Sequence, residues 1–415
     1  MKENAARSTA AGIFLLVLAG VLYTWGTWKY FTLRSPGGND FLTYYSVTEL
    51  FLKEGVNPYS DEAALYTQQA IFGRPALPGE DQHRLVYLPY ALLIHAPFTL
   101  LSYPAARALY MTVLQAALFS GVVLMMRLYR WKPPVWMQAL FLAWCLFSYP
   151  QARGIILGQF AILGFFSLAC TLYLLHQGRD RWAGAALVLA TVKPTLVFLV
   201  VPFLLLWGFA KKRRDFLISY GVCLGALLLG SLIVLPTWVS DYLVRLSTYS
   251  DYTVGQSPVW VLTHQFLPQL GTPVEILLTG LLAAWMLLAW RETFQSAEAE
   301  AGFHYALAVT LLVSNVIVPR SATANYAMLL VPIVWLFEQV DRRFTWGRGA
   351  LLAGMLVSLV GQWWLHYATV VGNKEQAVMF FPLPLALLAL LVWVRGLIRS
   401  DQAAALPGRE VRDVG

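Results

Sequence analysis

The chain has 415 residues, of which 58% are hydrophobic and 13% are charged, and its formal net charge is +8. A soluble domain has about 45–50% apolar and about 25% charged residues, so this composition excludes an ordinary soluble enzyme and a disordered protein. The mean hydropathy of +0.60 is typical of an integral membrane protein. At about 30 residues per span and loop, we expect an all-α bundle with roughly 11–13 membrane segments.

The first apolar run covers about residues 10–30 and follows two basic residues, Lys2 and Arg7. It is longer than the core of a signal peptide, which has roughly 7–15 residues. It also ends in aromatic residues, as spans do at the membrane surface. We therefore expect an uncleaved first span with a cytoplasmic N-terminus.

A long polar stretch, residues 31–84, follows as the expected first outer loop. Within it, apolar residues recur at helical spacing after Asp40 and again after Asp61, and a turn at residues 55–59 separates the two patterns. This spacing predicts amphipathic helices that lie on the membrane plane.

Successive apolar runs fill residues 85–398, and basic clusters separate many of them. Basic clusters of this kind mark cytoplasmic loops, so we expect membrane lipids as partners and no nucleic acid. Residues 1–400 then form one polytopic domain of the plasma membrane, and residues 401–415 form a short polar cytoplasmic tail. One ambiguity concerns residues 85–101: either this run does not cross fully, or one basic loop breaks the rule.

Lys193 and Pro194 interrupt a long apolar stretch, which has basic residues at both ends. We expect two short helices that enter the membrane and return to the same side. Non-helical backbone at membrane depth is tolerated where it lines a cavity, so Lys193 is a candidate site residue. The alternative is that its side chain extends to the membrane surface.

Three further polar positions are candidates because lipid disfavours them. Asp40 is either a helix cap or a general base, and the two roles are compatible. Arg153 is either a surface anchor or a phosphate ligand, and Arg320 is the strongest candidate for a phosphate ligand. We expect the substrate to be lined by Tyr44, Tyr59, Tyr87, Gln159 and Asn325. No metal-ligand spacing and no nucleotide-binding motif is present, so we expect no metal and no cofactor.

The order of the motifs resembles glycosyltransferase family 87 of the GT-C superfamily. The resemblance runs from about residue 10 to 326 and rests on Asp40 beyond the first span, a Gly-x-Asn-Pro-Tyr turn (Gly55, Asn57, Pro58, Tyr59), Tyr87 and Pro89, Leu101, Ser102 and Ala106, Gly158 and Gln159, and Lys193 and Pro194.

This resemblance implies a GT-C-type bundle that takes a sugar from a polyprenyl-phosphate donor on the non-cytoplasmic side and inverts the anomeric centre. Asp40 would be the general base, while Arg153, Lys193 and Arg320 would bind the donor phosphate. The acceptor would be a lipid or a glycan, and the sugar a hexose, with mannose as a candidate. The actinobacterial members of that family tend to carry a Ser-Pro…His-His stretch where this chain has Pro319, Arg320 and Ser321, then Asn325 and Tyr326.

Two other classes of function stay open on the sequence. Broken helices and intramembrane charges also suit a polytopic transporter or lipid flippase, although no inverted repeat is visible. A glycan ligase or polymerase would share the fold class and use a lipid-diphosphate donor.

Overall fold

The protein is helical throughout the part that the structure, a computed structural model, describes: residues 2–252, 257–295, 300–372 and 374–404. The N-terminal half contains α1 (Lys2–Thr27), η1 (Trp28–Thr32), α2 (Asn39–Glu54), α3 (Asp61–Phe72), α4 (Ala91–His95), η2 (Ala96–Leu100), α5 (Tyr103–Leu128), α6 (Val135–Phe147), α7 (Tyr149–Leu157), α8 (Ala161–His176), α9 (Asp180–Ala190), η3 (Pro194–Leu196) and α10 (Val200–Ala210). The C-terminal half contains α11 (Arg214–Val234), α12 (Trp238–Tyr252), α13 (Pro258–Val261), η4 (Leu262–Phe266), α14 (Gly271–Gln295), α15 (Glu300–Ile317), η5 (Thr323–Leu329), α16 (Leu330–Arg343), α17 (Gly347–Thr369), η6 (Ala377–Phe380) and α18 (Pro382–Ala404).

Several of these helices are long and apolar enough to cross a membrane, which confirms the predicted class of polytopic helical membrane protein. Six pass by length and composition among the described residues, or seven if α6 and α7, bent by 54°, form one span. On α11 the side chains of Ile218, Val222 and Ile233 are 61%, 64% and 82% exposed, as expected for a helix that faces lipid. The expected tail falls mostly outside the described residues, because α18 continues to Ala404 and residues 405–415 are not described.

The ambiguous run at residues 85–101 forms only two short helices. Together α4 and η2 cover residues 91–100, which is too short to cross a bilayer core of about 30 Å. The structure therefore favours the first of the two alternatives, a segment that does not cross fully.

The predicted pair of short helices around Lys193 is present as α9 and α10, with η3 at the break. Each helix has 11 residues, or about 16 Å at 1.5 Å per residue. Asp180, at the start of α9, accepts a 2.6 Å hydrogen bond from Arg213, which follows α10. Arg181 and Asp215 form a second ion pair at 3.1 Å. The chain thus returns to the end from which it started, with Lys193 at the opposite end.

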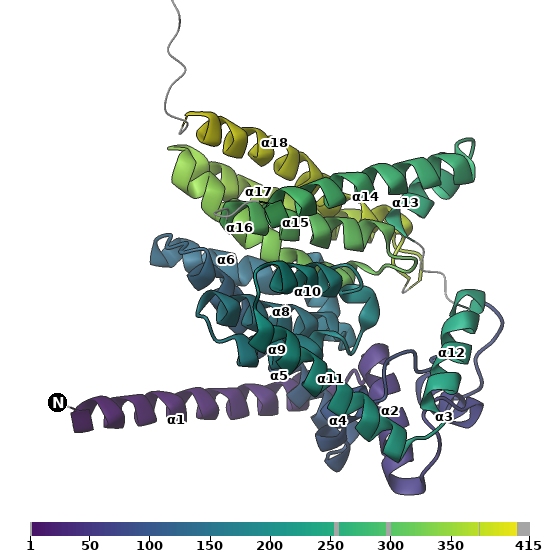
Figure 1. The fold of residues 1–415 in the computed structure, drawn as a ribbon. Helices are drawn as coiled ribbons and strands as arrows, with labels where there is room; N and C mark the ends of the chain where they lie inside the picture. The colour runs from purple at the N-terminus through teal and green to yellow at the C-terminus, as the bar shows by residue number, and fades with distance from the viewer. Residues whose placement is uncertain (1, 253–256, 296–299, 373, 405–415) are drawn as a thin grey trace, which may run out of the picture.

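The two predicted amphipathic helices of the first loop are α2 and α3. They lie beyond the C-terminal end of α1, at the opposite end of that helix from the N-terminus, and α12 lies close to them (Figure 1). The contact with α12 is specific: Asn57 donates a 2.7 Å hydrogen bond to Asp241, and Arg245 pairs with Asp61 at 3.0 Å. These contacts tie the Asn57–Tyr59 turn to α12, a helix about 180 residues further along the chain.

A close approach of α9 to α11 gives a first testable prediction. A Cβ atom on Gly184 would lie 2.4 Å from the backbone oxygen of Phe216, whereas one on Gly221 would meet nothing within 4 Å. Gly184→Leu should therefore destabilise the protein by about 1–3 kcal/mol, because backbone cannot move aside as a flexible side chain can. The measurement is the midpoint of thermal unfolding in detergent, with Gly221→Leu on the open face of α11 as the matched control. Equal midpoints for the two variants would contradict this packing.

Candidate functional site

Asp40 lies in the first turn of α2, and its position follows from the two glycines before it. Gly38 is the N-cap of the helix, with a left-handed φ of 74°, and Gly37 also has a positive φ of 25°. The capping interpretation of Asp40 is therefore wrong, because α2 begins at Asn39 and has no side-chain cap. Instead the Asp40 carboxylate accepts a 2.7 Å hydrogen bond from the side-chain amide of Gln159.

Three segments that are far apart in sequence extend this contact into a network. Lys193 Nζ donates to Gln159 Oε1 at 3.0 Å and to Asn325 Oδ1 at 2.8 Å. Gln159 follows α7, Lys193 stands at the break before η3, and Asn325 lies in η5. We call these four residues (Asp40, Gln159, Lys193 and Asn325) the polar network. All four were predicted as site residues, and the structure brings them together.

Burial raises the pKa of the Asp40 carboxyl above its ordinary value of 3.8, while the positive charge of Lys193 and the hydrogen bond from Gln159 oppose that rise. A carboxylate with a raised pKa is a better proton acceptor than an ordinary one. Asp40 is thus suited to general-base chemistry.

Lys193 provides a positive charge and hydrogen-bond donors beside the Asp40 carboxylate. An ammonium group has three N–H donors, and two of them go to the neutral amides of Gln159 and Asn325. No direct ion pair of Lys193 is found in the described part of the chain, and the carboxylate that acts on its charge, that of Asp40, is separated from it by Gln159. One N–H and the positive charge therefore stay available for an anionic ligand.

The three predicted tyrosines lie next to the network in different roles. Tyr44 donates its hydroxyl to that of Tyr87 at 2.6 Å, and Lys193 Nζ lies 5.8 Å from the centre of the Tyr87 ring. Tyr59 donates to the backbone oxygen of Tyr87 at 2.6 Å. Tyr59 therefore supports Tyr87 through its backbone, whereas Tyr87 itself adjoins Lys193.

The two predicted arginines occupy different surroundings from Lys193. Arg153 pairs with Glu375 at 3.6 Å and donates to the Tyr149 hydroxyl at 3.3 Å, so a carboxylate already offsets its charge. Glu375 also accepts a hydrogen bond from Thr323, two residues before Asn325. Sequence reasoning missed Glu375, which lies in a short loop with no pattern around it.

Arg320 stacks on the ring of Tyr249, with its guanidinium carbon 4.9 Å from the ring centre. Burial raises the pKa of Tyr87 well above its ordinary value, and the neighbouring Asp40 and Tyr249 add to that rise. Tyr249 is thus close enough to Tyr87 to affect that pKa.

Two residues of α5, Tyr103 and Arg107, hold the turn before Asp40 and were also missed. Tyr103 donates its hydroxyl to the backbone oxygens of Gly37 and Gly38, and Arg107 donates to those of Ser35 and Pro36. The sequence did contain a signal for Arg107, because a charged residue inside an apolar run is itself unusual.

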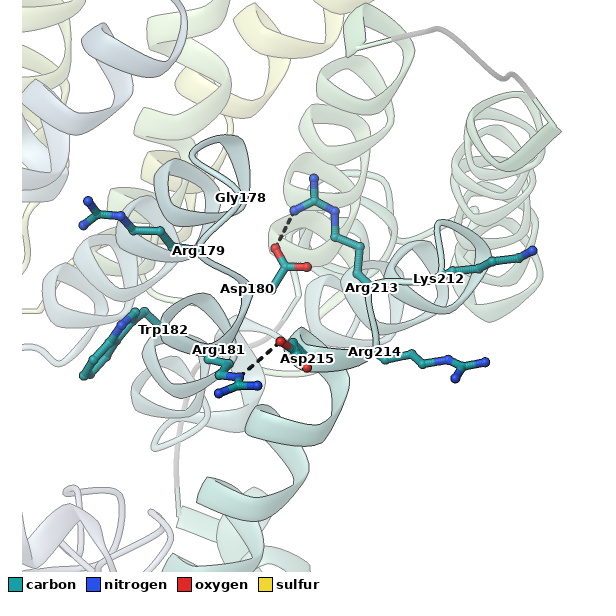
Figure 2. Close-up of a pocket in the computed structure, with 9 residues that line it drawn as sticks. All are labelled: Gly178, Arg179, Asp180, Arg181, Trp182, Lys212, Arg213, Arg214 and Asp215. Carbon is teal, nitrogen blue, oxygen red and sulfur yellow. Dashed lines mark hydrogen bonds and ion pairs between the residues drawn. The ribbon is translucent and has the colours of Figure 1, made fainter.

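A hollow of about 520 Å³ lies elsewhere, at the opposite ends of α9 and α10 (Figure 2). It is lined by Gly178, Arg179, Asp180, Arg181, Trp182, Lys212, Arg213, Arg214 and Asp215. The close-up shows its centre occupied by the ion pairs Asp180–Arg213 and Arg181–Asp215, while Arg179, Lys212 and Arg214 point outward. Because it is about one helix length from Lys193, it is not part of the polar network. Among the described residues no group of three or more His, Cys, Asp or Glu side chains could hold a metal ion.

Comparison with known proteins adds a family to this geometry. No curated protein and no solved structure matches the chain. The family model for glycosyltransferase family 87 matches residues 85–319, which is more than half of the chain. The match includes Tyr87, Gln159 and Lys193 of the site, while Asp40 precedes it and Asn325 follows it. With that match, the chain belongs to glycosyltransferase family 87 and is a multi-pass membrane glycosyltransferase.

Proposed function

We propose that this glycosyltransferase moves a hexose from a polyprenyl-phosphate donor to a lipid or glycan acceptor, with inversion at the anomeric carbon. The observation that carries the proposal is the polar network, in which a carboxylate with a raised pKa and an ammonium group with a free N–H share the same amide partner. Transfer from a lipid phosphate needs both groups. A base must accept the acceptor's proton, and a cation must stabilise the departing phosphate.

In the proposed step, the acceptor oxygen bonds to the anomeric carbon while the bond from that carbon to the phosphate oxygen breaks. The acceptor's proton passes to Asp40, and the bonding electrons leave with the phosphate oxygen. Lys193 then stabilises the charge that develops on the phosphate. Tyr44, Tyr59, Tyr87, Gln159 and Asn325 line or support this space.

Arg320 and Arg153 are proposed as further ligands of the donor phosphate. Arg320 lies over the ring of Tyr249, a residue close enough to Tyr87 to affect its pKa, and this supports its inclusion as a second cation. Arg153 would have to leave Glu375 before it could bind, and this ranks it below Lys193.

We place the reaction on the non-cytoplasmic face of the plasma membrane, with both termini in the cytoplasm. The proposal is supported by the position of Asp40 in the polar segment directly after α1, the expected first span, while the basic ends of α9 and α10 lie together at the opposite end from Lys193. Basic clusters favour the cytoplasmic side, so the network falls on the other one.

The sugar and the acceptor are not assigned. Where the actinobacterial members that this chain resembles tend to carry a histidine pair, this chain has Asn325, whose carbonyl oxygen binds Lys193. The carbonyl oxygen of an amide accepts a hydrogen bond from the Lys193 ammonium but carries no charge of its own. The substitution changes the chemistry beside the donor and is a reason to test several sugars.

The experiment that tests the function uses purified protein in lipid with radiolabelled polyprenyl-phosphate mannose, glucose, galactose and arabinose. Transfer to a membrane lipid extract from one of these donors is the expected result. Matched polyprenyl-diphosphate sugars and nucleotide sugars form the comparison arms. Transfer from a diphosphate donor alone would replace the proposal with a ligase or polymerase, and transfer from a nucleotide sugar alone would refute a lipid-linked donor.

The burial of Asp40 leads to a prediction for the pH dependence. Only the ionised carboxylate can accept a proton, so kcat/KM should rise as the pH is raised through the pKa of Asp40. Because burial raises that pKa, the half-maximal point should lie above the ordinary value of 3.8. The measurement is the initial transfer rate at low donor concentration across a pH series. A phosphodiester donor does not titrate in this range, so a midpoint at or below 3.8 would argue against a buried base.

A further inference from the structure

Arg107 is a buried cation on α5 that contacts two separate segments. Its side chain is only 3% exposed. Nη1 donates to the backbone oxygens of Ser35 and Pro36, both at 2.6 Å, and Nη2 donates to that of Ile156 at 3.0 Å. No ion pair of Arg107 is found within the described residues, so carbonyl dipoles rather than a carboxylate satisfy this charge.

The two segments are those that carry the hydrogen-bonded pair Asp40 and Gln159. Ser35 and Pro36 directly precede the glycine turn from which α2 starts, and Asp40 stands in the first turn of that helix. Ile156 lies at the end of α7, three residues before Gln159. The guanidinium of Arg107 therefore connects the backbone just before Asp40 to the backbone just before Gln159.

The packing around this connection leaves little room for movement. A Cβ atom on Gly38 would lie 2.4 Å from Arg107 Nε, and one on Gly158 would lie 2.4 Å from Phe41 Cβ. The ring of Phe31 also packs on Arg107, with its centre 5.2 Å from the guanidinium carbon. Tyr103, one helical turn before Arg107, holds the Gly37 and Gly38 carbonyls in the same way.

We propose that Arg107 is a positioning residue that sets the distance between Asp40 and Gln159, and through Gln159 between Asp40 and Lys193. The proposal rests on the function proposed above, since it assigns Arg107 no contact with either substrate. The planar fork of an arginine can bind several carbonyls in fixed directions, which an ammonium group cannot do. A positive charge at this position is thus not enough, because the contacts to the three carbonyl oxygens depend on the planar geometry of the guanidinium.

The decisive variant is Arg107→Lys, which keeps the charge and removes the fork. We expect kcat to fall by about 10–100-fold, because a misplacement of about 1 Å at a reacting group can cost that much. KM for the donor should change by less than about threefold, since Lys193 and its remaining partners stay in place. Amide hydrogen exchange should become faster at residues 37–42 and 156–160 together. Tyr103→Phe should give the same pattern with a smaller effect.

Arg213→Lys is the matched control, because Arg213 also donates to a backbone oxygen, that of Leu175, at the far end of α9. It should leave kcat and the exchange at both segments unchanged. An unchanged kcat in Arg107→Lys, or an equal fall in both variants, would overturn the positioning role. If Asp40→Asn stays active, the proposed base is wrong, and the Arg107 proposal is then judged by amide exchange alone. Faster exchange at both segments in Arg107→Lys would still show that Arg107 holds them. Unchanged exchange would refute that role.

Discussion

Replacement of Asp40 by Asn is expected to lower the rate of sugar transfer by about 10²–10⁴-fold, the range for removal of a general base. Asparagine has nearly the same shape and can still bond to Gln159 through its own oxygen, so the network should persist. It cannot, however, accept the acceptor's proton. The measurement is kcat for transfer from the best donor, with the midpoint of thermal unfolding recorded alongside.

The matched control for this experiment is Glu54→Gln at the other end of α2, where the carboxylate is exposed. It removes the same charge from the same helix and should leave kcat unchanged. An Asp40→Asn variant with full activity would keep the reaction class and remove Asp40 as the base. Glu375, a second carboxylate whose side chain is only 7% exposed, would then be the next candidate.

Replacement of Lys193 by Met is expected to lower kcat/KM for the donor by about 10²–10³-fold, the typical cost of losing one preorganised electrostatic contact to a developing charge. Methionine fills similar space but has no positive charge and no N–H donor. Both KM for the donor and kcat should be affected, because the phosphate is negatively charged before and after transfer. Initial rates at several donor concentrations would separate the two contributions.

An exposed lysine outside the site, Lys132 in the loop between α5 and α6, provides the comparison for this charge. Lys132→Met should leave both constants unchanged. If Lys193→Met altered only thermal stability, the residue would be a structural member of the network, and Arg320 would become the leading phosphate ligand. The double variant Lys193→Met with Arg320→Met would show whether the two cations act on the same phosphate.

Periodicity and composition predicted several local elements of the fold, because these features depend on neighbours along the chain. The spacing of aromatic residues after Asp40 predicted α2, and the turn at residues 55–59 predicted its end. Lys193 and Pro194 predicted the break between α9 and α10 for the same reason: proline cannot continue a helix, and lipid disfavours an unpaired charge. The order of the motifs indicated the family, which the match over residues 85–319 shows.

Local signals could not determine which of several roles a polar residue takes. Asp40 satisfied the sequence pattern of a helix cap and that of a base, and only the position of Gly38 removed the first. Residues 85–101 looked like a span, but the helices there end too early to cross. For Arg153 the sequence left open a surface anchor or a phosphate ligand, and only the structure showed Glu375, more than 200 positions later in the chain, beside it.

The sequence by itself determined that the protein is a helical membrane protein, where its amphipathic loop helices lie and which polar residues lipid would not tolerate. Tertiary structure alone decided which of these residues meet. Gln159 is 119 positions from Asp40, and Asn325 is 132 positions from Lys193, so no periodic pattern along one helix relates them. Their meeting depends on how α2, α7, η3 and η5 pack. That packing depends on particular close contacts, such as Arg107 against Gly38 and Phe41 against Gly158.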